Sequence, residues 1–269
     1  MSTEPRRPRP QTVLEVQHVD WLSPHMVRLV LTGPGYDNFV NNPATDKYVK
    51  IFFVKPELGL EPPYDIEALR ESLPQEDWPV VRTYTVRWAD DELRQLAIDF
   101  VVHGTEGIAG PWAAAAKVGD RVAFAGPGGA YSPRVDVAAH VFAGDESATP
   151  AIAAALESLP GDAKGVAVLE ADDFTDMQPI GAPDGVEILW VFRSRGEDLV
   201  SAVAALDWPA GDVQVFAHGE RESMKALRGI FADRGVSREL RSLSGYWAKG
   251  RTEDRFQAEK RDPIGQIGD

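Results

Sequence analysis

The run with the clearest chemical potential is Arg82-Thr83-Tyr84-Thr85-Val86-Arg87. Arg82 and Tyr84 are two positions apart, so on a strand their side chains share a face. A guanidinium placed there can hold a pyrophosphate through two hydrogen bonds, and a tyrosine ring can lie along a flat cofactor. Thr85 falls on the other face, so its spacing does not place it at the same ligand. The alternative is an ordinary strand of a β-barrel with an exposed arginine and a half-buried tyrosine.

A glycine-rich turn follows the next strand pattern and leads into a helix. The segment runs from His103-Gly104 through Gly107 to Ala109-Gly110-Pro111. Proline is favoured in the first turn of a helix, and the free N–H groups of a helix N-terminus can bind a phosphate. The sequence therefore predicts a second anion-binding element here. His103 itself is better explained as a solvated side chain at a strand end than as a catalytic acid.

A third element lies between a strand and a helix in the second half, at residues 144–150. Gly144 permits close backbone approach, and the following helix offers its N-terminus to a phosphate. The loop lacks the Gly-x-Gly-x-x-Gly spacing, so it is a weak dinucleotide signal by itself. An ordinary helix capped by Ser147 or Thr149 is the alternative, and taken alone the loop favours it.

The elements around these residues change character along the chain. The first half has short runs rich in valine, isoleucine and phenylalanine with period-two alternation, which predict six strands of a closed antiparallel barrel. The second half alternates strand and helix patterns, which predicts βαβ units and a parallel sheet. Expected barrel strands are 12–19, 26–32, 48–54, 81–88, 96–103 and 121–125. The expected sheet has strands 140–143, 165–170, 186–192, 213–217 and 243–247, with helices 149–158, 197–206 and 221–234.

The pattern divides the chain into a β-barrel domain and an α/β domain. We expect a flexible tail at 1–11, the barrel domain at 12–133, the α/β domain at 134–251 and a C-terminal tail at 252–269. The N-terminal segment contains arginine and proline without a following apolar run, so it is not a signal peptide. Apolar runs are too short to cross a bilayer. We therefore expect a cytoplasmic monomer without membrane insertion.

Composition excludes several classes of chemistry. The chain has no cysteine, which removes disulfides, thiol nucleophiles and thiolate-held metal clusters. Its five histidines are not paired at metal-ligand spacing, so no metal site is expected. A net charge of −14 disfavours nucleic acid and anionic membranes as partners. Redox chemistry in this chain would need an organic cofactor.

Taken in order, these segments resemble the siderophore-interacting protein family of ferric-siderophore reductases, from about residue 13 to 250. Each run is modest alone, and their ordered set is specific. The matching runs are Arg82–Arg87, 98–104 (Ile-Asp-Phe-Val-Val-His-Gly), 107–113, Gly119-Asp120, Gly126-Pro127-Gly128-Gly129, Gly144-Asp145-Glu146-Ser147, Pro150-Ala151-Ile152 and Gly245-Tyr246-Trp247 with Lys249-Gly250.

The resemblance implies a Greek-key FAD-binding barrel followed by a nicotinamide-binding domain like that of ferredoxin reductases. Carried over by position, Arg82, Tyr84, Thr85, His103, Gly104, Ala109 and Gly110 would hold FAD, while Gly144, Asp145, Glu146 and the His218-Gly219-Glu220 loop would face NADH or NADPH. No catalytic side chain is implied. Two positions depart from the pattern: many members have a serine in place of Gly110, and an arginine in place of Gly128.

The resemblance also implies a ferric siderophore as substrate, whose Fe(III) is reduced to Fe(II) for iron assimilation. Nicotinamide delivers two electrons and ferric iron accepts one, and flavin converts between them. Many ferric siderophores are anionic, so we expect a basic substrate patch formed by Lys50, Lys249 and Arg251, with solvated surface charge as the alternative. For the donor, acidic residues at 170–173 favour NADH, whereas Arg193 and Arg195 could hold the 2′-phosphate of NADPH.

Two other functions compete with this one. A flavin reductase of the same architecture could pass electrons to quinones, free flavin or a protein. A siderophore carrier without catalysis could use the barrel as a binding module, although it would not need the dinucleotide loop at 144–150.

Overall fold

The computed structural model describes residues 10–267, and most of the expected tail at 1–11 lies outside these residues. The chain divides into two units. The first extends to Gly129, except that Leu22–Met26 and Ala44–Asp46 group with the second unit, which begins at Ala130. The passage from one unit to the other thus falls a few residues before the expected boundary. Residues 252–267 belong to the second unit and contain a short helix.

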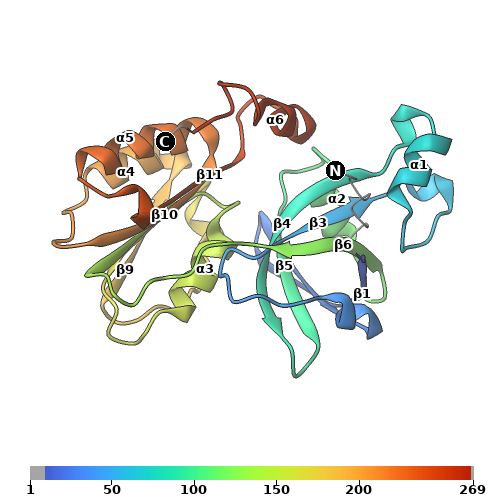
Figure 1. The fold of residues 1–269 in the computed structure, drawn as a ribbon, viewed down its shortest axis with the longest axis horizontal. Helices are drawn as coiled ribbons and strands as arrows, with labels where there is room; N and C mark the ends of the chain where they lie inside the picture. Colours follow the sequence, from blue (N-terminus) through green and yellow to red (C-terminus); the bar gives the residue numbers. More distant parts are fainter. Residues whose placement is uncertain (1–9, 268–269) are drawn as a thin grey trace, which may run out of the picture. The chain divides into compact units, whose positions relative to one another are not determined.

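The first unit is a closed barrel with the strand order β1-β2-β5-β4-β3-β6 (Figure 1). The pairings of β1 with β6, β6 with β3, β3 with β4 and β4 with β5 are antiparallel. The strands are β1 (Thr12–Ser23), β2 (Met26–Thr32), β3 (Tyr48–Phe53), β4 (Val80–Asp90), β5 (Gln95–Val101) and β6 (Arg121–Gly128). Six strands were predicted in these places, and the barrel prediction is confirmed.

Apolar side chains that alternate along these strands fill the barrel. Leu14 and Val16 on β1 are fully buried, and so are Phe100 on β5 and Phe124 on β6. Complete burial of one such side chain contributes about 2–3 kcal/mol. Two short helices belong to this unit, α1 (Ile66–Ser72) and α2 (Ala109–Ala115). Helix α2 packs on β5.

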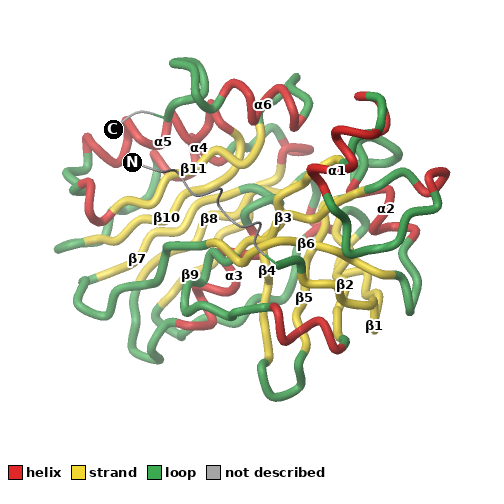
Figure 2. The backbone as a smooth tube through the Cα atoms, turned by 45° about the vertical axis from the view of Figure 1, so that its right-hand side comes forward, coloured by secondary structure: helices red, strands yellow, loops and turns green. Residues whose placement is uncertain are grey.

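The second unit is a parallel sheet with the order β11-β10-β7-β8-β9. Its strands are β7 (Ala139–Gly144), β8 (Gly165–Ala171), β9 (Val186–Phe192), β10 (Val213–Glu220) and β11 (Arg241–Trp247). The helices are α3 (Thr149–Ser158), α4 (Leu199–Ala204), α5 (Arg221–Asp233) and α6 (Glu253–Glu259). Figure 2 separates strands from helices by colour in both units.

Helices cover both faces of this sheet. Successive strand residues point to opposite sides, and those of the central strands are apolar on both sides. Val141 and Ala143 pack in the cluster that holds the buried side chains of α4 and α5, whereas Phe142 packs with α3. The parallel sheet predicted from the alternating pattern is confirmed. Helix α4 lies within the predicted 197–206 and begins later than predicted, because the Asp198 side chain accepts a hydrogen bond from the Ser201 N–H (2.8 Å) and caps the helix there.

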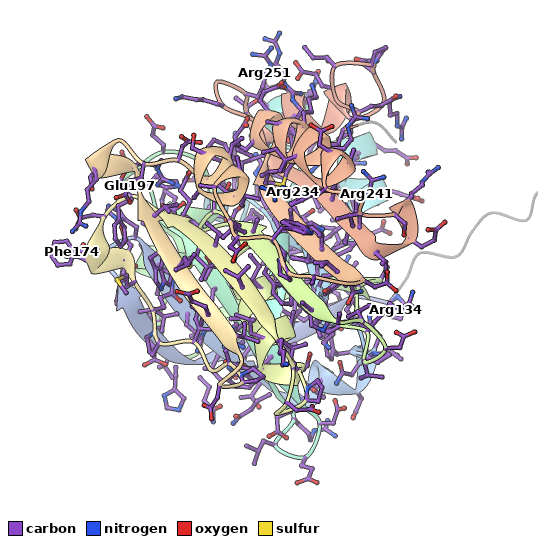
Figure 3. The ribbon with its side chains drawn as sticks, turned by 90° about the vertical axis from the view of Figure 1, so that its left-hand side faces the viewer. Arg134, Phe174, Glu197, Arg234, Arg241 and Arg251 are labelled. Atoms are coloured by element: carbon purple, nitrogen blue, oxygen red, sulfur yellow. The ribbon has the colours of Figure 1, made fainter. Side chains whose placement is uncertain are left out.

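The strand order places a switch point between β7 and β10. From β7 the chain continues to β8 and β9 on one side, and it then returns to β10 and β11 on the other. Ligands of open parallel sheets bind beyond the carboxyl ends of the strands at such a point. Figure 3 looks onto this sheet, with Arg134 and Arg241 toward its amino end and Glu197 and Arg251 toward its carboxyl end. Among the described residues, no helix has the length and apolarity to cross a membrane.

Candidate functional site

The register of β4 fixes which way its polar residues face. Arg82 lies opposite Ile51 and Tyr84 opposite Val49, and both partners on β3 belong to the barrel core. Residues directly opposite in an antiparallel pair share a face. Arg82 and Tyr84 therefore lie on one side of the strand, as predicted, and Thr85 lies on the other side, opposite Tyr48.

An aromatic cluster joins β4 to the start of α2. The rings of Tyr84 and Phe100 have centroids 4.4 Å apart, and Trp112 of α2 lies 6.0 Å from Phe100 and 5.5 Å from Phe53. Aromatic pairs at these separations are favourable beyond their buried area. The cluster fixes the N-terminal turn of α2 beside the strand that carries Arg82 and Tyr84.

The turn before α2 is shaped by glycine. Gly104 and Gly107 have φ of 56° and 78°, in the left-handed region that glycine adopts most readily. A Cβ on Gly110 would lie 2.9 Å from the carbonyl oxygen of Val101, so glycine here permits α2 to begin directly against the end of β5. The N-cap, Ile108, makes no side-chain hydrogen bond to the first turn of α2. His103 is exposed, as expected for a solvated strand-end residue.

The described residues fit a flavin dinucleotide. Arg82 and an uncapped helix start can serve phosphates, while Tyr84 supplies a ring for a flat cofactor. The glycines at the turn leave open space, because a Cβ on Gly104 or Gly107 would meet nothing within 4 Å.

The side chain of Tyr48 explains why position 128 is a glycine. The ring of Tyr48 covers Gly128, so that a Cβ there would lie 2.4 Å from Tyr48 Cζ. Tyr48 and Lys50 point from the same face of β3, and both are exposed. Lys50 has no ion pair with any residue of the described chain. The sequence analysis noted Gly128 but missed Tyr48, which only the β3–β6 pairing brings to it.

The predicted nicotinamide residues meet at the carboxyl edge of the parallel sheet. Gly144 ends β7 and pairs with His218 of β10, which places Asp145 and Glu146 beside Gly219 and Glu220. A Cβ on Gly144 would lie 2.9 Å from the His218 carbonyl oxygen, and one on Gly219 would lie 2.6 Å from Asp145 Oδ2. Glycine is therefore required where β7 and β10 diverge.

Asp145 is buried, and its carboxylate accepts four hydrogen bonds from protein groups. Oδ1 accepts from the N–H (2.9 Å) and hydroxyl of Ser147, while Oδ2 accepts from the Glu220 N–H (2.8 Å) and Trp247 Nε1 (2.7 Å). Burial raises the pKa of Asp145 to about 6, although the bonds from Ser147 and Trp247 act in the opposite direction. Asp145 was expected from the resemblance to face the cofactor, and its local sequence does not reveal this set of partners.

Glu146 pairs with Arg193, which follows β9. The same guanidinium bonds Glu170 Oε1 (3.1 Å) and lies 3.7 Å from Asp172 Oδ1. Three carboxylates thus surround one arginine, and hydrogen bonding to Glu146 is the main cause of its raised pKa. Arg195 instead stacks over the Phe192 ring, 5.1 Å from its centroid.

Glu220 and the basic residues behind β11 have structural partners. The Glu220 carboxylate accepts from the N–H groups of Glu222 and Ser223 and so caps α5. Its other oxygen accepts from the Lys249 N–H (3.1 Å), while the Lys249 side chain is exposed. Arg251, a member of the predicted substrate patch, bonds Glu259 Oε1 through Nε (2.8 Å).

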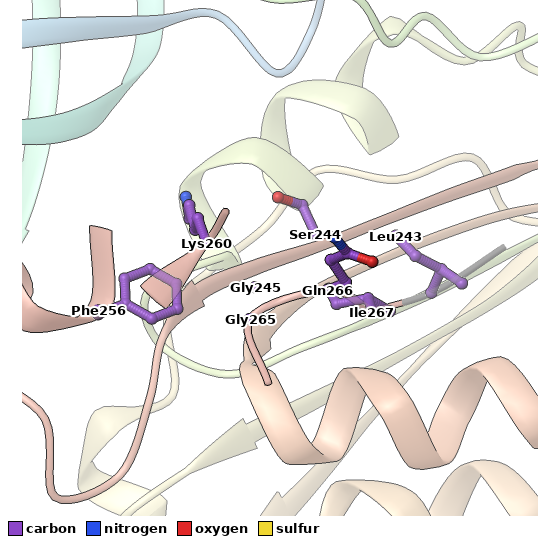
Figure 4. Close-up of a pocket in the computed structure, with 8 residues that line it drawn as sticks. All are labelled: Leu243, Ser244, Gly245, Phe256, Lys260, Gly265, Gln266 and Ile267. Carbon is purple, nitrogen blue, oxygen red and sulfur yellow. The ribbon is translucent and has the colours of Figure 1, made fainter. Parts of the chain in front are cut away.

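Glu259 joins α6 to the rest of the second unit. Besides Arg251, it bonds Arg221 (2.7 Å) and Arg255 (3.0 Å), and hydrogen bonding to Arg221 is the main cause that lowers its pKa to about 2. A pocket lies nearby, lined by Leu243, Ser244, Gly245, Phe256, Lys260, Gly265, Gln266 and Ile267 (Figure 4). None of the predicted site residues lines it.

Two protein-family models match the chain. The siderophore-interacting FAD-binding domain matches residues 15–131, and the siderophore-interacting protein model matches residues 137–250. The chain belongs to the siderophore-interacting protein family. This confirms the resemblance from the sequence, and FAD is the cofactor of the barrel unit.

Three relatives of known name or structure cover most of the chain. It is 33% identical to ferric vibriobactin reductase ViuB of Vibrio cholerae, over 97% of each chain. It is 32% identical to the NADPH-dependent ferric-chelate reductase of Escherichia coli, over 87% of this chain and 91% of the relative. The crystal structure of a siderophore utilization protein from T. fusca is similar with a TM-score of 0.78 and 35% identity, covering 90% of this chain and 94% of that one.

His218 gives the second unit a defined response to acid. Its ring is buried, packs at a tilt against the Phe216 ring and hydrogen-bonds Tyr246 Oη (2.9 Å) and Ser242 Oγ (3.0 Å). Burial lowers its pKa to about 3. Between that value and about 6.5 the unfolded chain binds a proton that the folded chain does not, so this group makes stability fall as the pH falls. Asp145 acts oppositely, because its raised pKa makes the folded chain take up a proton first.

We therefore expect His218→Gln to weaken the loss of stability in acid. The difference in free energy of unfolding between His218→Gln and the wild type should shift in favour of the variant by about 1.4 kcal/mol for each pH unit below about 6.5. Denaturant unfolding at a series of pH values measures this difference. His18→Gln, which removes an exposed imidazole outside the proposed sites, is the matched control. A difference between His218→Gln and wild type that stays constant with pH would contradict the assignment.

Proposed function

We propose that this protein is an FAD-dependent ferric-siderophore reductase that takes electrons from NAD(P)H and releases Fe(II). The observation that carries the proposal is the presence, in one chain, of a barrel that fits a flavin dinucleotide and a parallel sheet with a glycine-lined switch point. The names of the V. cholerae and E. coli relatives support a ferric complex as the electron acceptor.

In the barrel unit, some residues would bind the phosphates of FAD and others would orient its ring. Arg82 and the first turn of α2 would hold the phosphates of FAD, while Tyr84, fixed by Phe100, would orient its ring. Thr85, His103, Gly104, Ala109 and Gly110 would complete this site. Bound flavin would supply the exchange between two-electron hydride transfer from the nicotinamide and one-electron transfer to iron. Two ferric ions are thus reduced in turn for each NAD(P)H oxidised, with release of NAD(P)⁺ and a proton.

Spectroscopy tests the proposed electron path. Purified protein with FAD should be yellow, lose its flavin absorption when NADH or NADPH is added without oxygen, and regain it when a ferric siderophore is added. An Fe(II) chelator then reports the released metal. Flavin that is bleached but not reoxidised by ferric siderophores would contradict the proposed acceptor and favour another flavin reductase. Protein that takes up no FAD would overturn the proposal.

Lys50 is the best supported member of the proposed substrate patch. It is exposed on β3 next to Tyr48, whereas Arg251 is held by Glu259. Lys50→Ala should raise the KM for an anionic ferric siderophore several-fold and leave FAD binding unchanged, because one opposite charge at the binding surface is lost. Lys164→Ala, which removes an exposed lysine at the amino end of β8, is the matched control. An unchanged KM in Lys50→Ala would remove Lys50 from the site.

The electron donor that we propose is NADH. Arg193, the cation nearest the end of β8, is already paired with Glu146, Glu170 and Asp172. Acidic groups at this strand end accept hydrogen bonds from the ribose hydroxyls of NADH and repel the 2′-phosphate of NADPH.

Steady-state kinetics with both donors tests this choice. We expect kcat/KM for NADH to exceed that for NADPH by about tenfold, which corresponds to about 1.4 kcal/mol. Asp172→Asn should narrow the ratio, because it removes one negative charge beside Arg193. Asp184→Asn, an equal charge change at an exposed residue before β9, should not. A preference for NADPH in the wild type would contradict the proposal and would agree with the name of the E. coli relative.

A further inference from the structure

We infer that Asp145 is a positioning residue of the dinucleotide site, which holds Trp247 and the Gly219–Glu220 turn in place for a nicotinamide dinucleotide without contacting the dinucleotide itself. The inference rests on the proposed function and replaces the direct cofactor contact expected for Asp145 from the sequence.

The carboxylate of Asp145 joins the ends of three strands. Ser147 belongs to the loop after β7, Glu220 is the last residue of β10, and Trp247 is the last residue of β11. Trp247 and Asp145 are 102 positions apart, and Glu220 and Asp145 are 75 positions apart. This one side chain therefore connects the loop after β7 with the carboxyl ends of β10 and β11.

Space around the carboxylate excludes a direct role in ligand binding. Asp145 is only 3% exposed. Gly219 has a φ of 146° and lies so close that a Cβ would be 2.6 Å from Oδ2. Both oxygens already accept two hydrogen bonds from the protein. A ligand group would have to displace one of these donors from a buried position, which is costly.

Trp247 is oriented by this arrangement rather than by burial. Its Nε1 is anchored on Asp145, yet the residue is 39% exposed. An indole that is fixed by its N–H and open on the rest of its surface can offer a rigid apolar face to a flat ring. The same carboxylate orients the Glu220 N–H, and Glu220 in turn caps α5 and holds the Lys249 N–H.

The ionised form of Asp145 is the form that can accept all four hydrogen bonds, because a protonated carboxyl turns one acceptor position into a donor. Each group that faces it has a defined state. Glu146 in the same loop opposes its ionisation. On β10, His218 is neutral and Glu220 is engaged with α5; Arg221 is paired with Glu222 and Glu259. No cation among the described groups neutralises Asp145, so acid should loosen the arrangement.

The experiment uses the FAD-loaded protein and compares Asp145→Asn, Trp247→Phe and the double variant. Asparagine turns an amide N–H₂ toward donors that the carboxylate accepted from, whereas phenylalanine keeps one aromatic ring and removes the N–H together with the rest of the indole. We expect Asp145→Asn to raise the KM for the nicotinamide donor about tenfold with a smaller change in kcat, and to raise the Kd for the oxidised dinucleotide, measured by calorimetry, by a similar factor.

Two further results separate positioning from general damage. The double variant should be little worse than Asp145→Asn, since both changes remove the same hydrogen bond. In the wild type the KM for the donor should rise below about pH 6, and in Asp145→Asn it should not. Ser147→Ala, which removes the hydroxyl donor alone, should give a smaller effect and keeps the test possible if Asp145→Asn does not fold. Asp184→Asn is the charge-matched control.

Readouts that need no turnover keep this inference distinct from the proposed function. Amide hydrogen exchange at Glu220 should accelerate in Asp145→Asn, and the emission of Trp247, isolated by subtracting the spectrum of Trp247→Phe, should shift to longer wavelength. If these changes occur in a protein that reduces no ferric siderophore, the proposed acceptor fails and the positioning role stands. Independent, additive effects of the Asp145 and Trp247 substitutions on dinucleotide binding would overturn the positioning role.

Discussion

The carboxylate of Asp145 is buried at the point where β7 and β10 diverge, and the local geometry of the second unit depends on it. A buried carboxylate is costly unless donors surround it, and here four hydrogen bonds reach it from three loops. The donors must stay in place for the charge to be tolerated, so the loops are fixed together. Burial nevertheless raises the pKa of Asp145 to about 6, which links the arrangement to pH.

In the barrel the corresponding constraint is apolar. Tyr84, Phe100, Trp112 and Phe53 form one aromatic cluster that reaches from β3, β4 and β5 to α2. Packing these rings together holds the uncapped start of α2 against β5, the neighbour of the strand that carries Arg82. The turn between β5 and α2 is shaped by glycine at 104, 107 and 110. The packing of β5 and α2 on each other holds the two ends of this turn.

Charge is distributed so that most arginines near the proposed nicotinamide site are paired. Arg193 is enclosed by Glu146, Glu170 and Asp172, and Glu259 collects three arginines. In a chain with a net charge of −14, such pairing removes cations that an anionic ligand would otherwise use. Lys50 and Lys249 remain exposed. Arg251, which the sequence predicted as part of the substrate patch, is paired with Glu259 of α6.

The sequence by itself determined the two kinds of unit and most of their elements, because period-two and helix patterns are local and the absence of cysteine is absolute. It also showed that Arg82 and Tyr84 share a face, since strand geometry requires it. Only the tertiary structure decided the partners of Asp145, Arg193 and Arg251 and the neighbour of Gly128. Their partners lie far along the chain, as Trp247 does from Asp145, and strand order and register bring them together. A residue's type and local spacing do not reveal whether its charge is satisfied by the protein or left for a ligand.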